Sequence, residues 1–305
     1  MTLDIMMPFY GRFDHFREAV SSVLAQSDPD WRLTILDDVY PDPAPGKWAA
    51  AIEDERVTYL RNETNLRPSR NYNKAVSLVN NTFVVIMGCD DVMLPGFVAR
   101  AHELIARFPG VDVIQPGVSV IDENGTNSRP LADSVKKWLT PHGSKPVLLQ
   151  GEALAVSLLR GNWTYFPSLI WRSSRLAAGF RTDLDVVQDL AKLMEIALDG
   201  GALAADDAIV FHYRRHSGSV SAVTGPDGSK FAQERTVFEE CAASCEVRDW
   251  KHAARVARRH LMSRLNALTE LPAALRFGDT AGRGSLVRHI TGRSPAVPSR
   301  PGSRR

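Results

Sequence analysis

Short apolar runs alternate with amphipathic stretches over the first third of the chain, and the apolar runs end in polar or turn-forming residues. This alternation is typical of strand–helix–strand units, which build a mostly parallel sheet flanked by helices. In such a sheet the carboxyl ends of the strands lie at one edge, where α/β proteins bind ligands. The expected strands are residues 2–6, 32–36, 57–60 and 82–87. We therefore expect an α/β fold with a binding site at that edge.

Two stretches between these strands have apolar residues at helical spacing. Residues 13–26 and 71–79 are therefore expected to form helices that pack against the sheet. In the rest of the chain the pattern predicts helices at residues 97–108, 152–159, 189–198, 229–247 and 250–268. It predicts strands at residues 111–115, 118–121, 169–171 and 208–213. A turn is expected at residues 122–125 and an irregular stretch at 126–146.

Length and composition exclude several classes of protein. A chain of 305 residues predicts one large core with an appended part. The chain contains 37 Lys and Arg and 35 Asp and Glu, so its formal net charge is only +2. This charge is too small to indicate nucleic acid as the main partner. The cysteines, Cys89, Cys241 and Cys245, are too few for a disulfide framework, and this favours a reducing cytoplasm. The sequence shows neither a secretory leader nor a run of about 18 apolar residues, so we expect at most peripheral membrane contact.

The end of the chain differs from the rest. Residues 281–305 contain six Arg and no acid, interleaved with Gly, Ser and Pro. This composition predicts a disordered basic tail. The tail either contacts anionic lipid at the inner face of a membrane or is a solvated end without function. The segment ARVARRHLMSRL has one basic and one apolar face, which suits a homodimer contact or the same membrane surface.

Two pairs of adjacent acids follow expected strands. Asp37 and Asp38 follow the second strand, and Asp90 and Asp91 follow the fourth. Acids in such positions commonly cap the next helix. Alternatively, they hold a divalent cation, which is usually bound by one or two carboxylates together with substrate phosphates. Two acidic clusters at one sheet edge would repel each other unless a cation or a donor lies between them. The two pairs together therefore favour a metal-bound nucleotide diphosphate.

Four segments, taken in order, resemble glycosyltransferase family 2, whose GT-A domain binds a nucleotide-sugar: MPFYGR, ILDDVYPD, NLRPSRNYNKAV and VIMGCDDVMLPG. The resemblance covers about the first 125 residues and continues more weakly to about residue 222. The residues to which it assigns the site are Pro8, Phe9 and Tyr10 for the nucleotide pocket, Asp37 or Asp38 for the base, Arg70 for the base or ribose, and Asp90 and Asp91 for the metal and the sugar nucleotide.

One position departs from the family pattern. The usual run is Asp-x-Asp-Asp, whereas this chain has Gly88-Cys89-Asp90-Asp91, so Gly88 replaces the leading acid. The resemblance makes Asp90 the ligand of Mg²⁺ or Mn²⁺. The missing carboxylate predicts weaker metal binding. It also leaves open a module that binds a nucleotide-sugar without turning it over.

The resemblance also implies a general base, because an inverting transfer needs a group that takes the proton from the acceptor hydroxyl. In the segment VVQDLAKLMEIALDGG this residue is Asp189, and Gln188 stands where the family often has a second acid. Asp183 and Asp185 are nearby rivals. An Asp in the first turn of a helix is also explained by its favourable interaction with the helix dipole.

The segment FHYRRHSGSVS ends an expected strand in basic residues and small hydroxyls, which suit diphosphate oxygens. It resembles the segment that closes the site in the family, and His216 is the implied contact to the phosphates or the metal. His212 is expected inside the strand as a hydrogen-bonded core residue. Arg214 and Arg215 either meet the phosphates or are solvated, as most charged residues are.

The aromatic loop GNWTYFPS, residues 161–168, has two explanations. Trp163 and Tyr165 form a platform for the acceptor, because sugar rings stack on aromatic planes, or they pack in the core like most such residues. Trp138 and Trp171 are expected in the core.

We therefore expect a GT-A domain over residues 1–222, with a nucleotide-binding half to about residue 125 and an acceptor half after it. A helical appendage at residues 223–280 and the basic tail follow. The expected function is inverting transfer of a sugar from a UDP-, TDP- or GDP-linked donor to a hydroxyl of a carbohydrate or lipid-linked acceptor, in cell-envelope polysaccharide or glycoconjugate synthesis. A nucleotidyltransferase is disfavoured, because the segment after the first strand lacks a Gly-rich basic loop.

Overall fold

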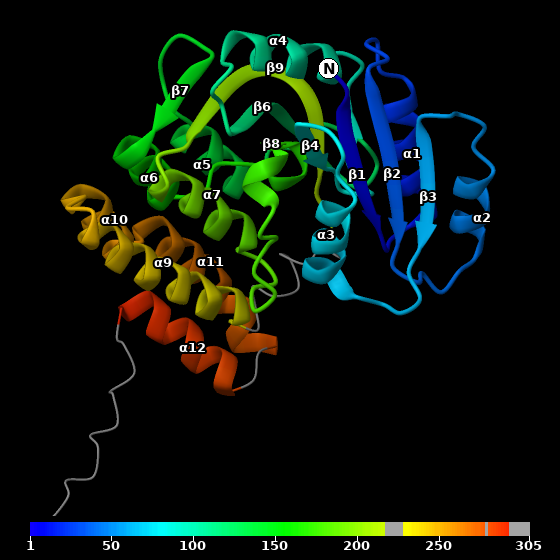
Figure 1. The fold of residues 1–305 in the computed structure, drawn as a ribbon. Coiled ribbons are helices and arrows are strands. Elements are labelled where there is room, and N and C mark those ends of the chain that lie inside the picture. The colour runs from blue at the N-terminus through cyan, green and yellow to red at the C-terminus, as the bar shows by residue number, and fades with distance from the viewer. Residues whose placement is uncertain (217–227, 278–279, 293–305) are drawn as a thin grey trace, which may run out of the picture.

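A nine-stranded sheet forms the centre of the computed structural model, which describes residues 1–216, 228–277 and 280–292 (Figure 1). The strand order along the sheet is β3-β2-β1-β4-β8-β6-β9-β5, and β7 pairs with β9 off this path. The strands are β1 (Leu3–Phe9), β2 (Trp31–Asp37), β3 (Val57–Arg61), β4 (Phe83–Ile86), β5 (Val92–Met93), β6 (Val113–Ile121), β7 (Val147–Gln150), β8 (Ile170–Arg172) and β9 (Ala202–Arg214).

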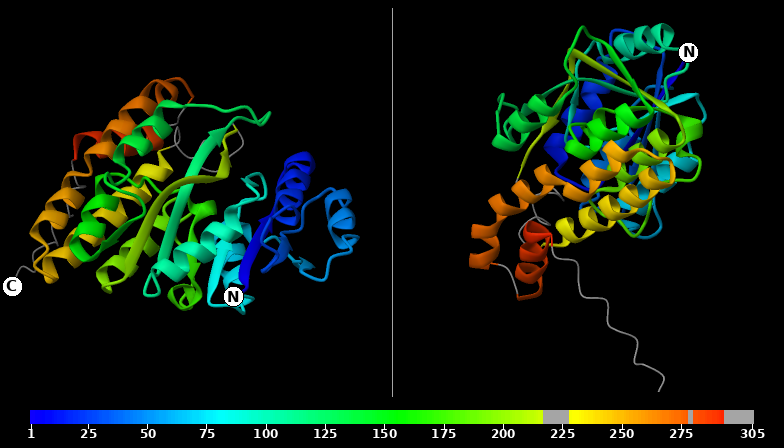
Figure 2. Two further views of the ribbon diagram at one scale, coloured as in Figure 1. Left: turned by 90° about the horizontal axis from the view of Figure 1, so that it is seen from above. Right: turned by 90° about the vertical axis from the view of Figure 1, so that its left-hand side faces the viewer.

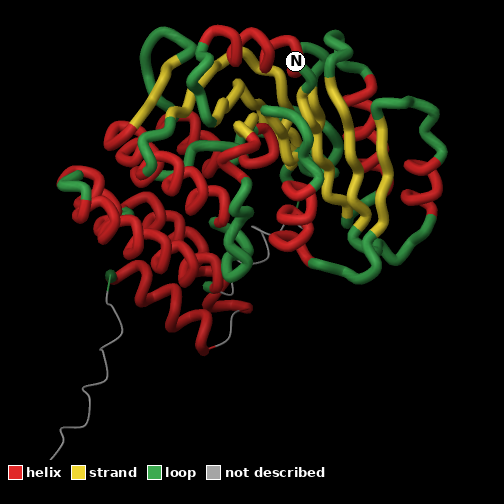
Figure 3. Tube along the Cα trace, viewed as in Figure 1, coloured by secondary structure: helices red, strands yellow, loops and turns green. Residues whose placement is uncertain are grey.

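Helices cover both faces of the sheet, as Figure 3 shows in red around the yellow strands. The α-helices of the described ranges are α1 (Phe13–Leu24), α2 (Ala44–Ala50), α3 (Arg67–Ser77), α4 (Phe97–Arg107), α5 (Leu131–Leu139), α6 (Gly151–Arg160), α7 (Gln188–Leu198), α9 (Ser229–Val247), α10 (Lys251–Arg259), α11 (Leu261–Phe277) and α12 (Thr280–Thr291). Alternate side chains of a strand point to opposite faces. In β1, Met6 joins the buried cluster under α3, whereas Ile5 joins the cluster under α1 and α4. The predicted α/β class is confirmed.

The strands β3, β2, β1 and β4 are parallel, as the sequence predicts. β1 pairs with both β2 and β4, and β2 pairs with β3. Phe9 at the end of β1 lies opposite Asp37 at the end of β2. The polar residues that follow these strands therefore lie at one edge of the sheet.

The other half of the sheet is mixed. β8 runs antiparallel to both β4 and β6, and β6 runs parallel to β9. β6 is one strand where the sequence predicts two, with its pairing to β9 interrupted at Gly117. A Cβ at Gly117 would lie 2.5 Å from the carbonyl oxygens of Asp207 and Ala208, so the close approach of β9 requires glycine there.

The C-terminal helices share the core of the sheet domain. Phe238 and Cys241 of α9 and Ala254 of α10 belong to the same buried cluster as Leu154 of α6 and Leu193 of α7. Figure 2 shows α9 and α10, in yellow and orange, packed along the green helices. α11 and α12 pack on α9 through a smaller cluster that contains Phe231, Ala267, Ala274 and Leu286. The predicted helical appendage is thus continuous with the core.

Several sequence expectations differ from the structure. The basic tail expected from residue 281 begins inside α12, where Leu286 and His289 are fully buried. Residues 293–305 of that tail lie outside the described residues. The helix expected at 250–268 is divided into α10 and α11 at His260, which has a positive φ of 29°. Much of the stretch expected to be irregular forms α5, and Trp138 on this helix is 66% exposed rather than buried in the core.

Within the described ranges, every helix is too short or too polar to cross a lipid bilayer.

Candidate functional site

The loop after β4 carries the acidic pair to the edge of the sheet. Asp91 is 1% exposed, and its Oδ1 accepts a hydrogen bond of 2.8 Å from the backbone N–H of Arg214. Its Oδ2 is also buried but has no hydrogen-bond partner in the described part of the chain. Burial and the adjacent charge of Asp90 raise the pKa of Asp91 well above its ordinary value. Asp91 therefore has one buried carboxylate oxygen that no described residue hydrogen-bonds.

Asp90 faces the end of β9. Its Oδ2 lies 2.7 Å from Nε2 of His216, and both side chains are partly exposed. This contact with Asp90 raises the pKa of His216. The two residues are 126 positions apart in the chain, and the structure brings them together as the sequence analysis expects.

Arg214 fixes the loop that holds the acidic pair. Its side chain is 1% exposed, its Nε donates to the carbonyl of Asp90 at 2.6 Å, and one terminal nitrogen pairs with Glu18 at 2.6 Å. The other terminal nitrogen donates to the carbonyl of Asp122 at 3.2 Å. Of the two alternatives given for Arg214, the solvated one is therefore wrong, because β9, α1 and the turn after β6 enclose the side chain.

The position of Gly88 explains the departure from the family pattern. A Cβ built on Gly88 would lie against the carboxylates of both Asp91 and Asp90. The loop therefore has no room for a leading acid while the two carboxylates point as they do.

The earlier acidic pair is buried in a local hydrogen-bond network. Asp37 accepts bonds from the Tyr59 hydroxyl and from Arg61, each at 2.6 Å. Asp38 accepts bonds from Nδ2 of Asn62 and from the backbone N–H groups of residues 66 and 67, at 2.7 to 2.9 Å. Asp38 thereby fixes the loop that leads into α3, and Asp37 ties the end of β2 to β3. A nucleobase would bind in addition to these partners.

The three residues expected to line the nucleotide pocket differ in exposure. Phe9 is 0% exposed and stacks on Phe16 with ring centroids 4.0 Å apart, so its side chain packs in the core, and its place at the nucleotide pocket stays a prediction. Tyr10 is 53% exposed and meets the Tyr40 ring edge-on at 5.3 Å. Pro8 is partly buried, and Arg70 is exposed in the first turn of α3. Tyr10 and Arg70 are therefore available to a ligand at this edge.

Asp189 and Asp90 both lie close enough to Tyr72 for their charges to act on it. Asp189 is in the first turn of α7, and its Oδ2 accepts a bond of 2.9 Å from Nδ2 of Asn162. Burial raises the pKa of Asp189. Burial also raises the pKa of Tyr72, and the charges of Asp90 and Asp189 both add to this shift. The two carboxylates thus act on the same side chain.

A cluster of polar and charged side chains around α5 lies on this side of the site, and it was not predicted from the sequence. The ammonium of Lys136 donates to the carbonyl of Thr164 at 2.6 Å and lies 4.4 Å from the ring centre of Tyr165. Burial lowers the pKa of Lys136 to about 8, opposed by the charge of Asp189. Asp133 accepts bonds from the Tyr165 hydroxyl at 3.0 Å and from Arg215 at 2.5 Å. The helical spacing of apolar residues in 131–139 is the signal that could have revealed this helix.

The aromatic loop divides into a buried and a partly exposed part. Trp163 is 1% exposed, and its indole N–H donates to Ser157 at 3.1 Å. A side chain enclosed in this way offers no face to a sugar, so the prediction of Trp163 as an acceptor platform is wrong. Tyr165 is partly exposed and remains a candidate. Trp171 is buried, as predicted, and His212 is half-buried in β9.

The acidic loop after β4 offers several donor atoms to a metal ion. The described ranges contain no group of three or more His, Cys, Asp or Glu side chains arranged to hold one. However, Asp90, His216 and the unpartnered Oδ2 of Asp91 lie at one loop. A hard cation that takes its remaining oxygens from substrate phosphates needs only one or two carboxylates. The donor set therefore fits a site completed by substrate.

Comparison with curated proteins finds partial matches. The chain is 26% identical over 129 residues to an uncharacterized glycosyltransferase of Methanocaldococcus jannaschii, covering 40% of this chain and 43% of that protein. It is 31% identical over 111 residues to the succinoglycan biosynthesis protein ExoW of Rhizobium meliloti, covering 35% and 34% of the two chains. The chain thus spans less than half the length of these curated relatives.

Solved structures match over nearly the whole chain. Residues 1–349 of S. aureus TarS, in complex with UDP-GlcNAc, superpose with a TM-score of 0.66 at 18% identity, covering 95% of this chain and 82% of that one. The mannosyltransferase PcManGT of Pyrobaculum calidifontis, in complex with GDP-Man and Mn²⁺, gives a TM-score of 0.57 at 15% identity, covering 95% and 79%. At these identities the likeness shows the fold alone. The family model for glycosyl transferase family 2 matches residues 4–158, a little more than half of the chain, and the protein therefore belongs to that family.

Proposed function

We propose that the protein is an inverting glycosyltransferase that moves a sugar from a nucleotide-diphosphate sugar to a hydroxyl acceptor. The observation that carries this proposal is the acidic loop after β4, in which Asp90 meets His216 and Asp91 keeps an unpartnered buried oxygen. Relatives named for succinoglycan and colanic acid biosynthesis support a role in synthesis of an envelope polysaccharide or glycoconjugate.

The donor nucleotide is proposed to bind along the ends of β1 and β2. Tyr10 and Arg70 are the exposed side chains there, and they are assigned to the base and the ribose. Asp37 or Asp38 would accept one further hydrogen bond from the base, beside the partners that already hold these carboxylates. The structural neighbours in complex with UDP-GlcNAc and GDP-Man support this class of donor.

The diphosphate is proposed to lie at Asp90, Asp91 and His216. These residues would hold Mg²⁺ or Mn²⁺, in agreement with the Mn²⁺ complex of one structural neighbour. When bound, such an ion supplies positive charge that stabilises the departing diphosphate. Arg214 keeps both carboxylates in place through the carbonyl of Asp90 and the Oδ1 of Asp91.

The acceptor hydroxyl is proposed to lie between Asp189 and the donor. Asp189 takes the hydroxyl proton while the acceptor oxygen forms a bond to the anomeric carbon and the bond from that carbon to the diphosphate oxygen breaks. The electron pair of the broken bond leaves with the diphosphate. Asn162 orients Asp189, and the raised pKa of this carboxylate makes it a stronger base than an ordinary Asp. Tyr165 and Asp91 are assigned to the sugar and acceptor side.

A panel of sugar nucleotides tests the donor and the metal together. The melting temperature of the protein should rise with sugars of one nucleotide only, and Mn²⁺ should increase the shift. Asp90→Ala should abolish the shift, whereas Asp185→Ala, at an exposed rival position, should retain it. If no nucleotide stabilises the protein at any metal concentration, the proposed function is wrong.

Release of the nucleoside diphosphate separates an enzyme from a binding module. The same panel is followed for diphosphate release with carbohydrate and lipid-linked acceptors. Turnover that is lost in Asp189→Asn, with the nucleotide-induced melting shift unchanged, supports the transferase. Binding of one nucleotide-sugar without release in any mixture would support the module that Gly88 leaves open.

A further inference from the structure

The helix α11 presents a row of leucines to solvent. Leu261, Leu265, Leu268 and Leu275 are between 46% and 58% exposed, and their spacing places them on one side of the helix. The opposite side is anchored by Ala267 and Ala274, which are fully buried against α9 and α12. We call these four residues the leucine face. A contiguous exposed apolar surface of this kind marks an interaction site.

The helix α5 also exposes large apolar side chains. Leu131 and Trp138 are 72% and 66% exposed, and they lie seven residues apart on one side of α5. A Cβ built on Gly161 would lie 2.6 Å from Cδ1 of Leu139 and 3.4 Å from Cβ of Met262, so the end of α5 and the start of α11 meet there. Both views of Figure 2 show the two helices on the same side of the molecule. The exposed side chains of α5 therefore lie near the start of the leucine face.

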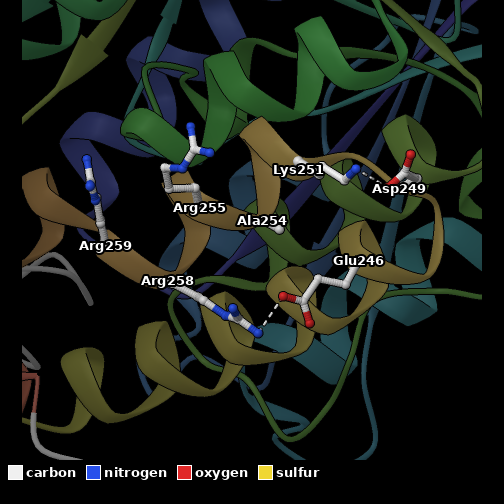
Figure 4. Close-up of a pocket in the computed structure, with 7 residues that line it drawn as sticks. All are labelled: Glu246, Asp249, Lys251, Ala254, Arg255, Arg258 and Arg259. Atoms are coloured by element: carbon white, nitrogen blue, oxygen red, sulfur yellow. Dashed lines mark ion pairs between the residues drawn. The ribbon is translucent and has the colours of Figure 1, made fainter.

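The neighbouring helix α10 is strongly basic. Lys251, Arg255, Arg258 and Arg259 line a surface hollow of about 570 Å³ (Figure 4). Arg258 pairs with Glu246, and Lys251 pairs with Asp249 at 3.3 Å. In the described part of the chain, Arg255 and Arg259 are exposed and make no hydrogen bond or ion pair. Their charges are available to a partner.

The charge of the chain is divided between its two parts. Residues 251–305 contain twelve Lys and Arg and two acids, whereas residues 1–250 contain 25 and 33. A basic surface beside exposed leucines and a Trp is the composition of helices that lie in the interface of an anionic bilayer. A second copy of this chain would bring the same positive charges together, so the charge argues against a homodimer through this face.

We propose that the leucine face, together with Leu131 and Trp138, docks on an anionic lipid bilayer. α11 would lie in the plane of the interface with its leucines among the acyl chains, and Arg255 and Arg259 would contact the headgroups. The side of α5 opposite this surface carries Asp133 and Lys136, which belong to the cluster near Asp189. If the proposed function also holds, docking would bring the acceptor side of the site near lipid-linked acceptors. The docking itself does not depend on the activity.

Vesicle flotation tests the docking with the full chain. The protein should bind vesicles of phosphatidylcholine mixed with phosphatidylglycerol, but not vesicles of phosphatidylcholine alone. Replacing two leucines in Leu265→Gln/Leu268→Gln should weaken binding by about a hundredfold or more, since both apolar side chains would be lost from the acyl region. Ile209→Gln, at an exposed isoleucine of β9, is the control and should bind like the parent. Circular dichroism checks that all variants remain folded.

Charge reversal tests the electrostatic part. Arg255→Glu/Arg259→Glu should weaken binding by more than about tenfold at low salt, because two positive charges near the anionic leaflet become negative. Arg32→Glu/Arg107→Glu makes the same change in charge at exposed positions of β2 and α4 and should have little effect.

Tryptophan fluorescence reports insertion directly. Trp138 is the most exposed of the six tryptophans, all of which are described, so its emission should shift to the blue on anionic vesicles. The shift should disappear in Trp138→Phe while flotation persists. Binding that the leucine variant leaves unchanged, or the absence of any binding to anionic vesicles, would overturn the proposal. So would a dimer in sedimentation that the leucine variant dissociates.

Discussion

At the scale of single residues, Gly88 determines how the acidic pair is arranged. A side chain at this position would meet the carboxylates of Asp90 and Asp91. We expect Gly88→Ala to lower the free energy of unfolding by about 1–3 kcal/mol through overpacking, and to reduce transfer activity as well. Urea unfolding and an activity assay measure the two effects. Gly110→Ala is the control, because a Cβ there meets nothing within 4 Å. Equal stability of the two variants would show that the loop adapts.

Restoring the family's leading acid should not improve the enzyme. Gly88→Asp adds both volume and a third negative charge beside Asp91, whose pKa is already raised by burial and by Asp90. Transfer activity is measured against Mn²⁺ concentration for the parent and for Gly88→Asp. Activity of the variant at a lower Mn²⁺ concentration would contradict the prediction.

Asp189, the proposed general base, should lower the stability of the folded protein when it ionises. Because burial raises its pKa above the ordinary 3.8, the folded protein binds this proton more tightly than the unfolded chain, and ionisation of Asp189 lowers stability as the pH rises through that window. Asp189→Asn should therefore lower kcat by about 10²–10⁴-fold, while the melting temperature at neutral pH stays equal or rises. Asp185→Asn should change neither.

The pH profile gives a second test of Asp189. Activity should fall on the acid side as Asp189 gains its proton, with a midpoint above that of an ordinary carboxylate. If the acid side of the pH profile is the same in Asp189→Glu and Asp189→Asn as in the parent protein, another residue is the general base.

Lys136 should affect stability in the alkaline range. Its pKa is about 8 in the folded protein and 10.5 for an ordinary Lys. Between these values the unfolded chain binds more protons, so the free energy of unfolding should rise with pH through this window. Lys136→Met should remove this rise, whereas Lys137→Met, at the exposed neighbour, should keep it. Urea unfolding across pH 8–10.5 compares the three proteins.

At the scale of secondary-structure elements, the end of β9 organises the site through Arg214. Its backbone and side chain bind Asp90, Asp91, Asp122 and Glu18, which come from three other segments. Arg214→Met should reduce the free energy of unfolding by about 3–5 kcal/mol, because it leaves buried acceptors without a donor. Arg17→Met on the exposed side of α1 is the control for loss of one charge. A small effect of Arg214→Met would mean that water replaces the guanidinium.

The sheet edge at the carboxyl ends of β1, β2 and β4 was predictable because the local sequence pattern determines it. Each parallel strand is a short apolar run, and its last residues are polar, so the ends of β1, β2 and β4 could be placed together without coordinates. The resemblance assigned both His216 and Asp90 to the metal, and local pattern alone would not have placed these two residues together.

The acceptor side was predicted less well because tertiary packing determines it. Trp163 and Trp138 are both aromatic residues in polar surroundings, yet one is 1% exposed and the other 66%. Trp138 lies on α5, a helix within the stretch that was expected to be irregular, whereas Trp163 lies in the loop after α6 and packs in the core cluster. The side chains that bind Asp37 and Asp38 likewise come from residues 59–62, which no local rule connects to these acids.

At the scale of the whole molecule, the C-terminal helices should unfold together with the sheet. Phe238 of α9 is 4% exposed in the cluster that also contains α6 and α7. Phe238→Ala should lower the free energy of unfolding of the entire molecule by about 3–5 kcal/mol, with one transition seen by calorimetry and by fluorescence of the buried tryptophans. Val247→Ala, 86% exposed on the same helix, should have little effect. Two separate transitions would contradict a shared core.

The same packing constrains the construction of chimeras between members of the family. A junction at residue 158, where the family match ends, would cut through α6, and one at residue 222 would part α9 from its partners on α6 and α7. An exchange of acceptor preference should instead join the parents between β6 and α5, so that everything from α5 to α12 is inherited from one parent.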